Sequence, residues 1–240
     1  MGNHLNFNSN SDKERFKQEA EEVERKAPAL RLINHPSRTL VIGRSQSGKT
    51  TLAMKVIKKL ITQTEQLFIC STTAEHQEIW EDVLPLADIV SDNLKVFIEL
   101  VDKKLANDEY AIPTLIVLDD VSYQEGLNER STGSMNGYFY NAVWWNLSLV
   151  VICHRLQNVG SGIRENLENL ILFQVLNQRQ IQEIAETYGV FNNKREFMDV
   201  YNKLVTEPIL HRKDEHPFMY ISYGKTISVY SNFSRRLVFN

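Results

Sequence analysis

The segment GRSQSGKT, residues 43–50, constrains the fold of this chain more than any other part of the sequence. It satisfies the pattern G-x-x-x-x-G-K-[ST], in which glycines let successive backbone N–H groups turn inward around an anion. An apolar run at residues 39–42 precedes it, and apolar residues at helical spacing follow it at residues 52–61. A strand, a glycine-rich turn and the positively polarised start of a helix together predict a phosphate-binding loop.

The loop predicts how a nucleotide is held. We expect Lys49 to reach the β- and γ-phosphates of ATP and Thr50 to bind Mg²⁺. On the following helix, we expect an apolar face to be buried and Lys55, Lys58 and Lys59 to lie on the opposite face. The residues expected to surround the phosphates are Gly43, Arg44, Ser45, Gln46, Ser47, Gly48, Lys49, Thr50 and Thr51.

Further along the chain, apolar runs alternate with helical patterns in the manner of βαβ units. Strands are expected at residues 39–42, 66–70, 114–120, 147–153 and 169–175, with helical material at 74–84 and 93–108. Because these runs are continuously apolar, they suit strands that are buried on both faces of a parallel sheet. The predicted fold is an α/β P-loop NTPase of the RecA-like, additional-strand type, with a mainly parallel central sheet and a C-terminal β-hairpin turning at Gly224-Lys225.

The sequence divides into two parts. Residues 1–37 form a polar N-terminal arm, partly helical, whose first ten residues are expected to be disordered. The arm is either a solvated segment or a contact to another subunit made through Phe16 and Val23. Residues 38–240 form the ATPase domain, including the C-terminal hairpin.

Polar residues at the ends of two predicted strands supply candidates for the rest of an active site. Asp119 and Asp120 end the strand at 114–120, so we expect Asp119 to support Mg²⁺ and Asp120 to orient the attacking water. If the strand at 147–153 is inserted between the strands of the two nucleotide-binding motifs, His154 lies where it can sense the γ-phosphate or simply bond to local backbone. Arg164 is the candidate arginine finger, with Arg155 as its alternative, and each is equally explained as a surface arginine.

Composition limits the remaining possibilities. The net charge of −3 gives no global basic field of the kind that marks a compact DNA-binding module, so any DNA contact must be local. Cys70 and Cys153 are not at metal-ligand spacing and are expected to be buried thiols in a reducing compartment. No apolar stretch approaches the length of a membrane span, so we expect an intracellular protein without membrane insertion. The sequence Asp119-Asp120-Val121-Ser122 lacks the Asp-x-x-Gly that a GTPase would carry there.

Taken together, these motifs resemble the FtsK/HerA-type viral genome-packaging ATPases, in particular the branch of poxviruses, giant viruses and virophages. The likeness covers most of residues 38–235: the loop GRSQSGKT, the strand running into STT with Trp80 after it, LIVLDD, and NLSLVVICHRLQNVGSGIREN leading into LILFQV. Relatives carry Gln where this chain has His154, and an Arg-His-like pair where it has Trp144-Trp145. We expect the two tryptophans to pack against other side chains rather than stack on DNA.

The resemblance implies a motor that uses ATP and Mg²⁺ to drive double-stranded DNA into a preformed capsid. It further implies a homo-oligomeric ring in which Arg164 serves a neighbouring subunit's nucleotide, a capsid or portal-vertex protein as partner, and a place in the cytoplasmic viral factory of the host cell or in the virion. Two alternatives remain at this point. One is a cellular or plasmid-type FtsK/HerA translocase, and the other is a nucleotide-dependent structural switch that does not hydrolyse ATP.

Overall fold

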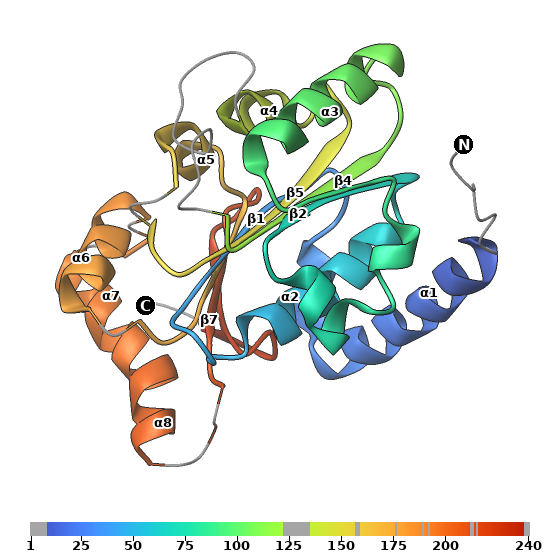
Figure 1. The fold of residues 1–240 in the computed structure, drawn as a ribbon. Helices are drawn as coiled ribbons and strands as arrows, with labels where there is room; N and C mark the ends of the chain where they lie inside the picture. Colours follow the sequence, from blue (N-terminus) through green and yellow to red (C-terminus); the bar gives the residue numbers. More distant parts are fainter. Residues whose placement is uncertain are drawn as a thin grey trace.

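The computed structural model describes residues 9–121, 135–156, 159–175, 177–188, 190–191, 193–211, 214 and 216–237. Most of the N-terminal segment expected to be disordered lies outside these residues. Figure 1 shows the chain as one sheet with helices on both faces.

Within the described residues, the strands form a single nine-stranded sheet in the order β3-β2-β4-β5-β1-β6-β7-β8-β9. The strands from β3 to β6 in this order are parallel, and β7, β8 and β9 add antiparallel pairings at one side. The strands are β1 (Arg38–Ile42), β2 (Gln66–Ser71), β3 (Ile89–Ser91), β4 (Thr114–Asp119), β5 (Leu147–Cys153), β6 (Asn169–Leu172), β7 (Met219–Ser222), β8 (Ser228–Ser231) and β9 (Arg235–Leu237).

The position of β5 decides the class of the sheet. Leu149 pairs with Arg38 of β1 on one side and with Ile116 of β4 on the other. The strand before the phosphate-binding loop is therefore separated by one strand from the strand that ends in Asp119. This confirms the predicted additional-strand arrangement.

Helices cover both faces of this sheet. The α-helices are α1 (Ser9–Lys26), α2 (Lys49–Ile61), α3 (Leu94–Asn107), α4 (Met135–Asn141), α5 (Ser161–Glu165), α6 (Gln178–Thr187), α7 (Lys194–Tyr201) and α8 (Glu207–Leu210). A π-helical turn, Asn202–Thr206, joins α7 to α8, and short 3₁₀ helices lie at Pro28–Leu32, Ala74–His76, Glu78–Trp80 and Leu84–Leu86.

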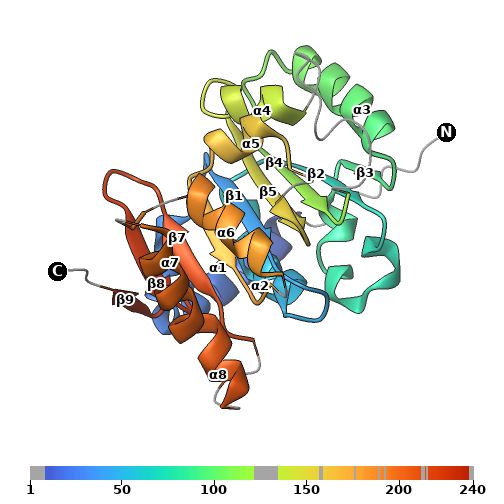
Figure 2. The same ribbon diagram turned by 90° about the vertical axis from the view of Figure 1, so that its left-hand side faces the viewer.

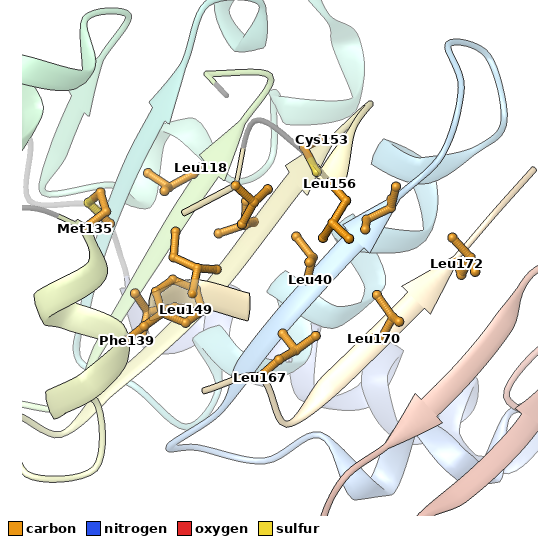
Figure 3. Packing of buried hydrophobic residues seen from close by; sticks show 14 of the residues in the cluster. Leu40, Leu118, Met135, Phe139, Leu149, Cys153, Leu156, Leu167, Leu170 and Leu172 are labelled. Carbon is orange, nitrogen blue, oxygen red and sulfur yellow. The ribbon is translucent and has the colours of Figure 1, made fainter. Parts of the chain in front are cut away.

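Alternate residues of the central strands point to opposite faces and create two separate cores. Leu40 packs with residues of α3 to α7, whereas its neighbour Val41 packs with residues of α1 and α2. Figure 3 shows part of the first core, where Phe139 of α4 lies against Leu149 of the sheet. Because both faces are buried, the central strands must be apolar at every position, as the sequence pattern indicates.

Helix α1 is attached to this second core. Phe16 is fully buried, and its ring lies under the ammonium group of Lys58 of α2 at 4.9 Å. The same ammonium pairs with Glu19 at 3.0 Å. This polar helix with a thin apolar stripe is thus held by one aromatic anchor and by charges around it. Figure 1 shows α1 beside α2. Whether it also contacts another subunit stays a prediction.

Four details differ from the sequence-based expectations. Residues 74–84, expected to be helical, form only short 3₁₀ turns. The hairpin does not turn on two residues, because Ser222 pairs with Ser228 and leaves a five-residue connection at 223–227. Lys59 is not on the exposed face of α2: its ammonium is buried and bonds to the carbonyl of Leu30 and the carboxylate of Glu24, each at 2.8 Å.

The fourth difference concerns the two tryptophans. Trp145 packs as expected, with its ring stacked on Tyr110 at a centroid distance of 4.6 Å. Trp144 does not, since it is 84 % exposed. It lies between α4 and the start of β5, where one ring of the pair faces the core and the other faces away.

Candidate functional site

The phosphate-binding loop follows β1 directly and is fixed by backbone hydrogen bonds to its two neighbours in the sheet. The N–H of Gly43 donates to the carbonyl of Cys153 at 3.3 Å, and the N–H of Arg44 donates to the carbonyl of Gln174 at 2.9 Å. The first two residues of the loop are thus held between the ends of β5 and β6. It leads into α2, the 13-residue helix whose positive end points at the loop.

The two glycines of the motif are required for different reasons. A Cβ at Gly43 would lie 2.5 Å from the Cβ of Phe173 and 2.8 Å from the Oγ of Ser47, so no side chain fits there. Gly48 has φ +86°, a left-handed conformation that residues with a Cβ rarely adopt. Gln46 also has a positive φ of 60°. These angles curl the backbone into the concave shape that binds phosphate.

Lys49 begins α2 and is largely buried at 6 % exposure. Its ammonium donates to the carbonyl of Arg44 at 3.0 Å and lies 3.3 Å from Nδ1 of His154. Burial lowers the pKa of this ammonium, while the carboxylates of Asp120 and Asp119 act to raise it. The side chain therefore lies over the concave side of the loop, between the backbone and two acids.

Asp119 is the last residue of β4 and is 1 % exposed. Burial, followed by the neighbouring charge of Asp120, raises the pKa of this carboxyl to about 7, although Lys49 and the Ser71 hydroxyl oppose the shift. The hydroxyl of Ser71 donates to Oδ2 at 3.4 Å, and Oδ1 is buried without a hydrogen-bond partner. A buried acid with an open oxygen beside the loop is suited to a cation.

These residues fit a Mg²⁺ ion that is shared with a nucleotide. Within the described residues no cluster of three or more His, Cys, Asp or Glu side chains could hold a metal without help. Mg²⁺ characteristically takes one or two protein oxygens and completes its shell with phosphate oxygens and water. That Asp119 and the hydroxyl of Thr50 supply such a pair of oxygens stays a prediction.

Asp120 and His154 form a direct contact next to Lys49. Nε2 of His154 lies 3.1 Å from the carboxylate of Asp120, and Nδ1 lies 3.2 Å from the carbonyl of Gly43. Because a carboxylate only accepts, Nε2–H must be the donor, which leaves Nδ1 free to accept from Lys49 when the ring is neutral. Asp120 has φ 54°, the left-handed region that Asp and Asn tolerate better than most residues.

The structure therefore brings together three of the four residues predicted to be catalytic. Lys49, Asp120 and His154 form one chain of contacts at the carboxyl ends of β1, β4 and β5. Arg164, the fourth, lies on α5 and its Nη1 is 3.7 Å from the carboxylate of Glu183 of α6. Arg155 follows His154 directly and is exposed. The roles of the arginines stay predictions.

Sequence reasoning missed two supporting residues. Ser71 ends β2 and reaches Asp119 because the carboxyl ends of paired parallel strands lie at the same edge of the sheet. The serine after the predicted strand 66–70 was a usable signal. Gln180 of α6 donates through Nε2 to the carbonyl of His154 at 3.0 Å and fixes the backbone there. Nothing in the local sequence around Gln180 indicates this contact, which depends on how α6 folds back over the sheet.

This sheet order, with a phosphate-binding loop after β1 and paired acids at the end of β4, defines a P-loop NTPase of the additional-strand type. The chain belongs to the Poxvirus A32 protein family, whose model matches residues 24–215. The resemblance drawn from the motifs is thereby confirmed at the level of the family.

Solved structures support the same fold. The genome packaging NTPase B204 of Sulfolobus turreted icosahedral virus 2, in complex with AMPPCP, is 14% identical with a TM-score of 0.57 over 85% of this chain and 99% of its own. B204, the DNA-packaging ATPase of Sulfolobus turreted icosahedral virus, is 11% identical with a TM-score of 0.52 over 80% of this chain and 95% of its own.

A third structure comes from a cellular protein. The cytoplasmic domain of the Thermomonospora curvata Type VII secretion ATPase EccC is 11% identical with a TM-score of 0.52, over 83% of this chain but 27% of its own. No curated protein matches the chain. At these identities the structures establish the P-loop NTPase fold, and they agree with the nucleotide binding that the loop predicts.

None of the helices in the described part of the chain is both long and apolar enough to cross a lipid bilayer.

Proposed function

We propose that this protein is an ATP-driven motor that translocates double-stranded viral DNA into a preformed capsid. The observation that carries the proposal is the contact chain Lys49–His154–Asp120 beside the phosphate-binding loop, in a chain of the Poxvirus A32 protein family. A P-loop with both an open buried acid and a second acid held by a sensor-like histidine is equipped for hydrolysis as well as binding.

Each residue has a role in this proposal. Lys49 and the loop backbone bind the β- and γ-phosphates, and Thr50 and Asp119 hold Mg²⁺, which neutralises charge on the phosphates. Asp120 orients the attacking water and accepts its proton. His154 donates to Asp120 and, through Nδ1, contacts the lysine that holds the γ-phosphate. Hydrolysis would therefore change the contacts that run from Asp120 through His154 to Lys49, and His154 also contacts the backbone carbonyl of Gly43 at the start of the loop.

The wider assembly follows from the same proposal. We place the protein in a homo-oligomeric ring around the DNA, with Arg164 or Arg155 reaching the nucleotide of the neighbouring subunit. The ring would dock on a capsid or portal-vertex protein in the cytoplasmic viral factory. The two B204 proteins are packaging ATPases, and the comparison covers at least 95% of the length of each. This favours the assignment over a cellular translocase.

The proposal is tested by steady-state ATP hydrolysis of the purified protein with and without long double-stranded DNA. Asp120→Asn is the sharpest variant because Asn keeps the size of the side chain and tolerates the φ of 54° at this position. Lys49→Ala should abolish nucleotide binding. Lys55→Ala, on the exposed face of the same helix, is the matched control and should behave as wild type.

Hydrolysis that DNA stimulates, and that Asp120→Asn reduces at least about a hundredfold while ATP still binds, is the expected result. A non-hydrolysing structural switch behaves differently. It would bind nucleotide without turnover under any DNA condition, and Asp120→Asn would leave its assembly unchanged. That outcome would reject the motor.

A further inference from the structure

Ser71 lies at the carboxyl end of β2, next to the last residue of β4. The two strands are parallel neighbours whose register pairs Ser71 with Asp119. Figure 2 shows β2 and β4 side by side. Both residues are buried, at 5 % and 1 % exposure. The two side chains therefore meet inside the protein, at the same edge of the sheet from which the phosphate-binding loop emerges.

The hydrogen bonds of the Ser71 hydroxyl have a fixed direction. Its oxygen accepts from the backbone N–H of Thr73 at 3.2 Å and from the backbone N–H of Ala74 at 3.1 Å. A hydroxyl has two acceptor lone pairs and one donor hydrogen, so both acceptor positions are filled by backbone groups. The single hydrogen is left for Oδ2 of Asp119, at 3.4 Å. Ser71 is therefore a donor to this carboxyl and cannot accept from it.

The segment that fixes Ser71 is itself anchored in the core. Ala74 begins the 3₁₀ helix Ala74–His76 and is 2 % exposed. The next 3₁₀ helix, Glu78–Trp80, ends in a tryptophan that is fully buried in the second core. The two N–H groups that hold the hydroxyl therefore belong to packed backbone, and the donor hydrogen of Ser71 is oriented in advance.

The two oxygens of Asp119 differ because of this contact. Oδ2 accepts from Ser71, whereas Oδ1 is buried without a hydrogen-bond partner. A carboxyl group can rotate about its terminal bond, so one fixed donor on one oxygen selects a single orientation and leaves the other oxygen open. An open, oriented carboxylate oxygen is a ligand that Mg²⁺ takes.

We propose that Ser71 is the positioning residue for Asp119: its hydroxyl holds Oδ2 so that Oδ1 is presented to the Mg²⁺ that accompanies ATP. This inference rests on the proposed function, because it concerns the metal of the same nucleotide. Ser71 acts only through Asp119 and contacts neither the ion nor the phosphates. Hydrogen-bond partners of metal-binding side chains commonly orient them in this way.

The test measures how much Mg²⁺ strengthens nucleotide binding. A non-hydrolysable ATP analogue is titrated by calorimetry in Mg²⁺ and in EDTA, and the ratio of the two affinities gives the contribution of the ion. The proteins are wild type, Ser71→Ala, Asp119→Asn and the double variant. Ser148→Ala is the matched control, because Ser148 is also a buried strand serine and its hydroxyl accepts from the N–H of Ser37 at 3.1 Å. It lies near the amino end of β5, at the opposite edge of the sheet.

Ser71→Ala should reduce the strengthening by Mg²⁺ about tenfold and leave the affinity in EDTA unchanged. Tenfold is the lower end of the range for such orienting partners, and the bond of 3.4 Å is a long one. The double variant should bind no more weakly than Asp119→Asn alone, because Ser71 acts only through Asp119. Ser148→Ala should match wild type in both solutions.

Ser71→Thr is the second variant, in case the loss of the hydroxyl also disturbs the fold. It keeps a hydroxyl at this position and should keep the effect of Mg²⁺. A wild-type Mg²⁺ effect in Ser71→Ala, an equal loss of affinity with Mg²⁺ and with EDTA, or a lost Mg²⁺ effect in folded Ser71→Thr would overturn the positioning role. So would a wild type whose binding Mg²⁺ does not strengthen. A wild type that binds no nucleotide in either solution would instead count against the proposed ATPase itself.

Discussion

The raised pKa of the Asp119 carboxyl leads to a prediction that links stability to function. Its carboxyl has a pKa raised from 3.8 to about 7, mainly by burial, so the folded protein holds its proton more tightly than the unfolded chain does. Stability from this group is fully present at low pH and is lost as the pH rises from the unfolded value toward 7. In the absence of Mg²⁺, the acid that we propose as a metal ligand therefore destabilises the fold at neutral pH.

The size of the effect follows from the two pKa values. Each rise of one pH unit within this range lowers the free energy of unfolding by about 1.4 kcal/mol. The reason is that the unfolded chain ionises Asp119 tenfold more readily at each step, whereas the folded protein keeps the carboxyl protonated. Over the whole interval from 3.8 to about 7 the cost is roughly 4 kcal/mol, and between pH 5 and pH 8 it is roughly 3 kcal/mol. Asp119→Asn removes the charge and keeps the shape, so the variant should lack this loss.

The assay is urea unfolding followed by circular dichroism at pH 5 and pH 8, with EDTA and without nucleotide. Other titrating groups are common to both proteins and largely cancel in the difference. Relative to Asp119→Asn, the wild type should lose roughly 3 kcal/mol between the two pH values. The variant should also be inactive as an ATPase. An identical pH dependence of wild type and variant would refute the reasoning.

Two further substitutions test the fold around the site. Phe16→Ala should lower the free energy of unfolding by about 3–5 kcal/mol, because the ring that attaches α1 is fully buried. Lys17→Ala, at an exposed position of the same helix, should change it by less than about 0.5 kcal/mol. Equal urea midpoints for the two variants would show that α1 is not docked. Gly43→Ala should cost about 1–3 kcal/mol and weaken ATP binding, because the new Cβ collides with Phe173. Gly224→Ala, whose Cβ would meet nothing closer than 3.9 Å, is its control, and equal thermal unfolding of the two would contradict the predicted collision.

The parts of the fold that the sequence predicts well are those with strong local signals. The strands β1, β2, β4 and β5 are continuous apolar runs whose ends are marked by glycine, serine, aspartate or histidine, and all four lie where they are expected. The insertion of β5 between β1 and β4 is also as predicted. In such a sheet, strand order and the polar strand ends together determine which side chains meet, so the contact among Lys49, Asp120 and His154 was within reach of sequence reasoning.

The parts that it predicts poorly depend on tertiary contacts. The periodicity of α2 suggests an exposed Lys59, but α1 and the 3₁₀ helix after it cover that side of α2 and supply Leu30 and Glu24 as partners. The short strands β3 and β9 have three residues each, too few to show a period.

The central claim, ATP-driven movement along double-stranded DNA, is tested most directly by displacement of a third strand. A labelled triplex-forming oligonucleotide is placed on a long linear duplex, and its release is followed after ATP and Mg²⁺ are added. The account predicts release that requires ATP hydrolysis, is absent in Asp120→Asn and persists in Lys55→Ala. An active ATPase that never displaces the third strand, on DNA to which it is shown to bind, would contradict the account.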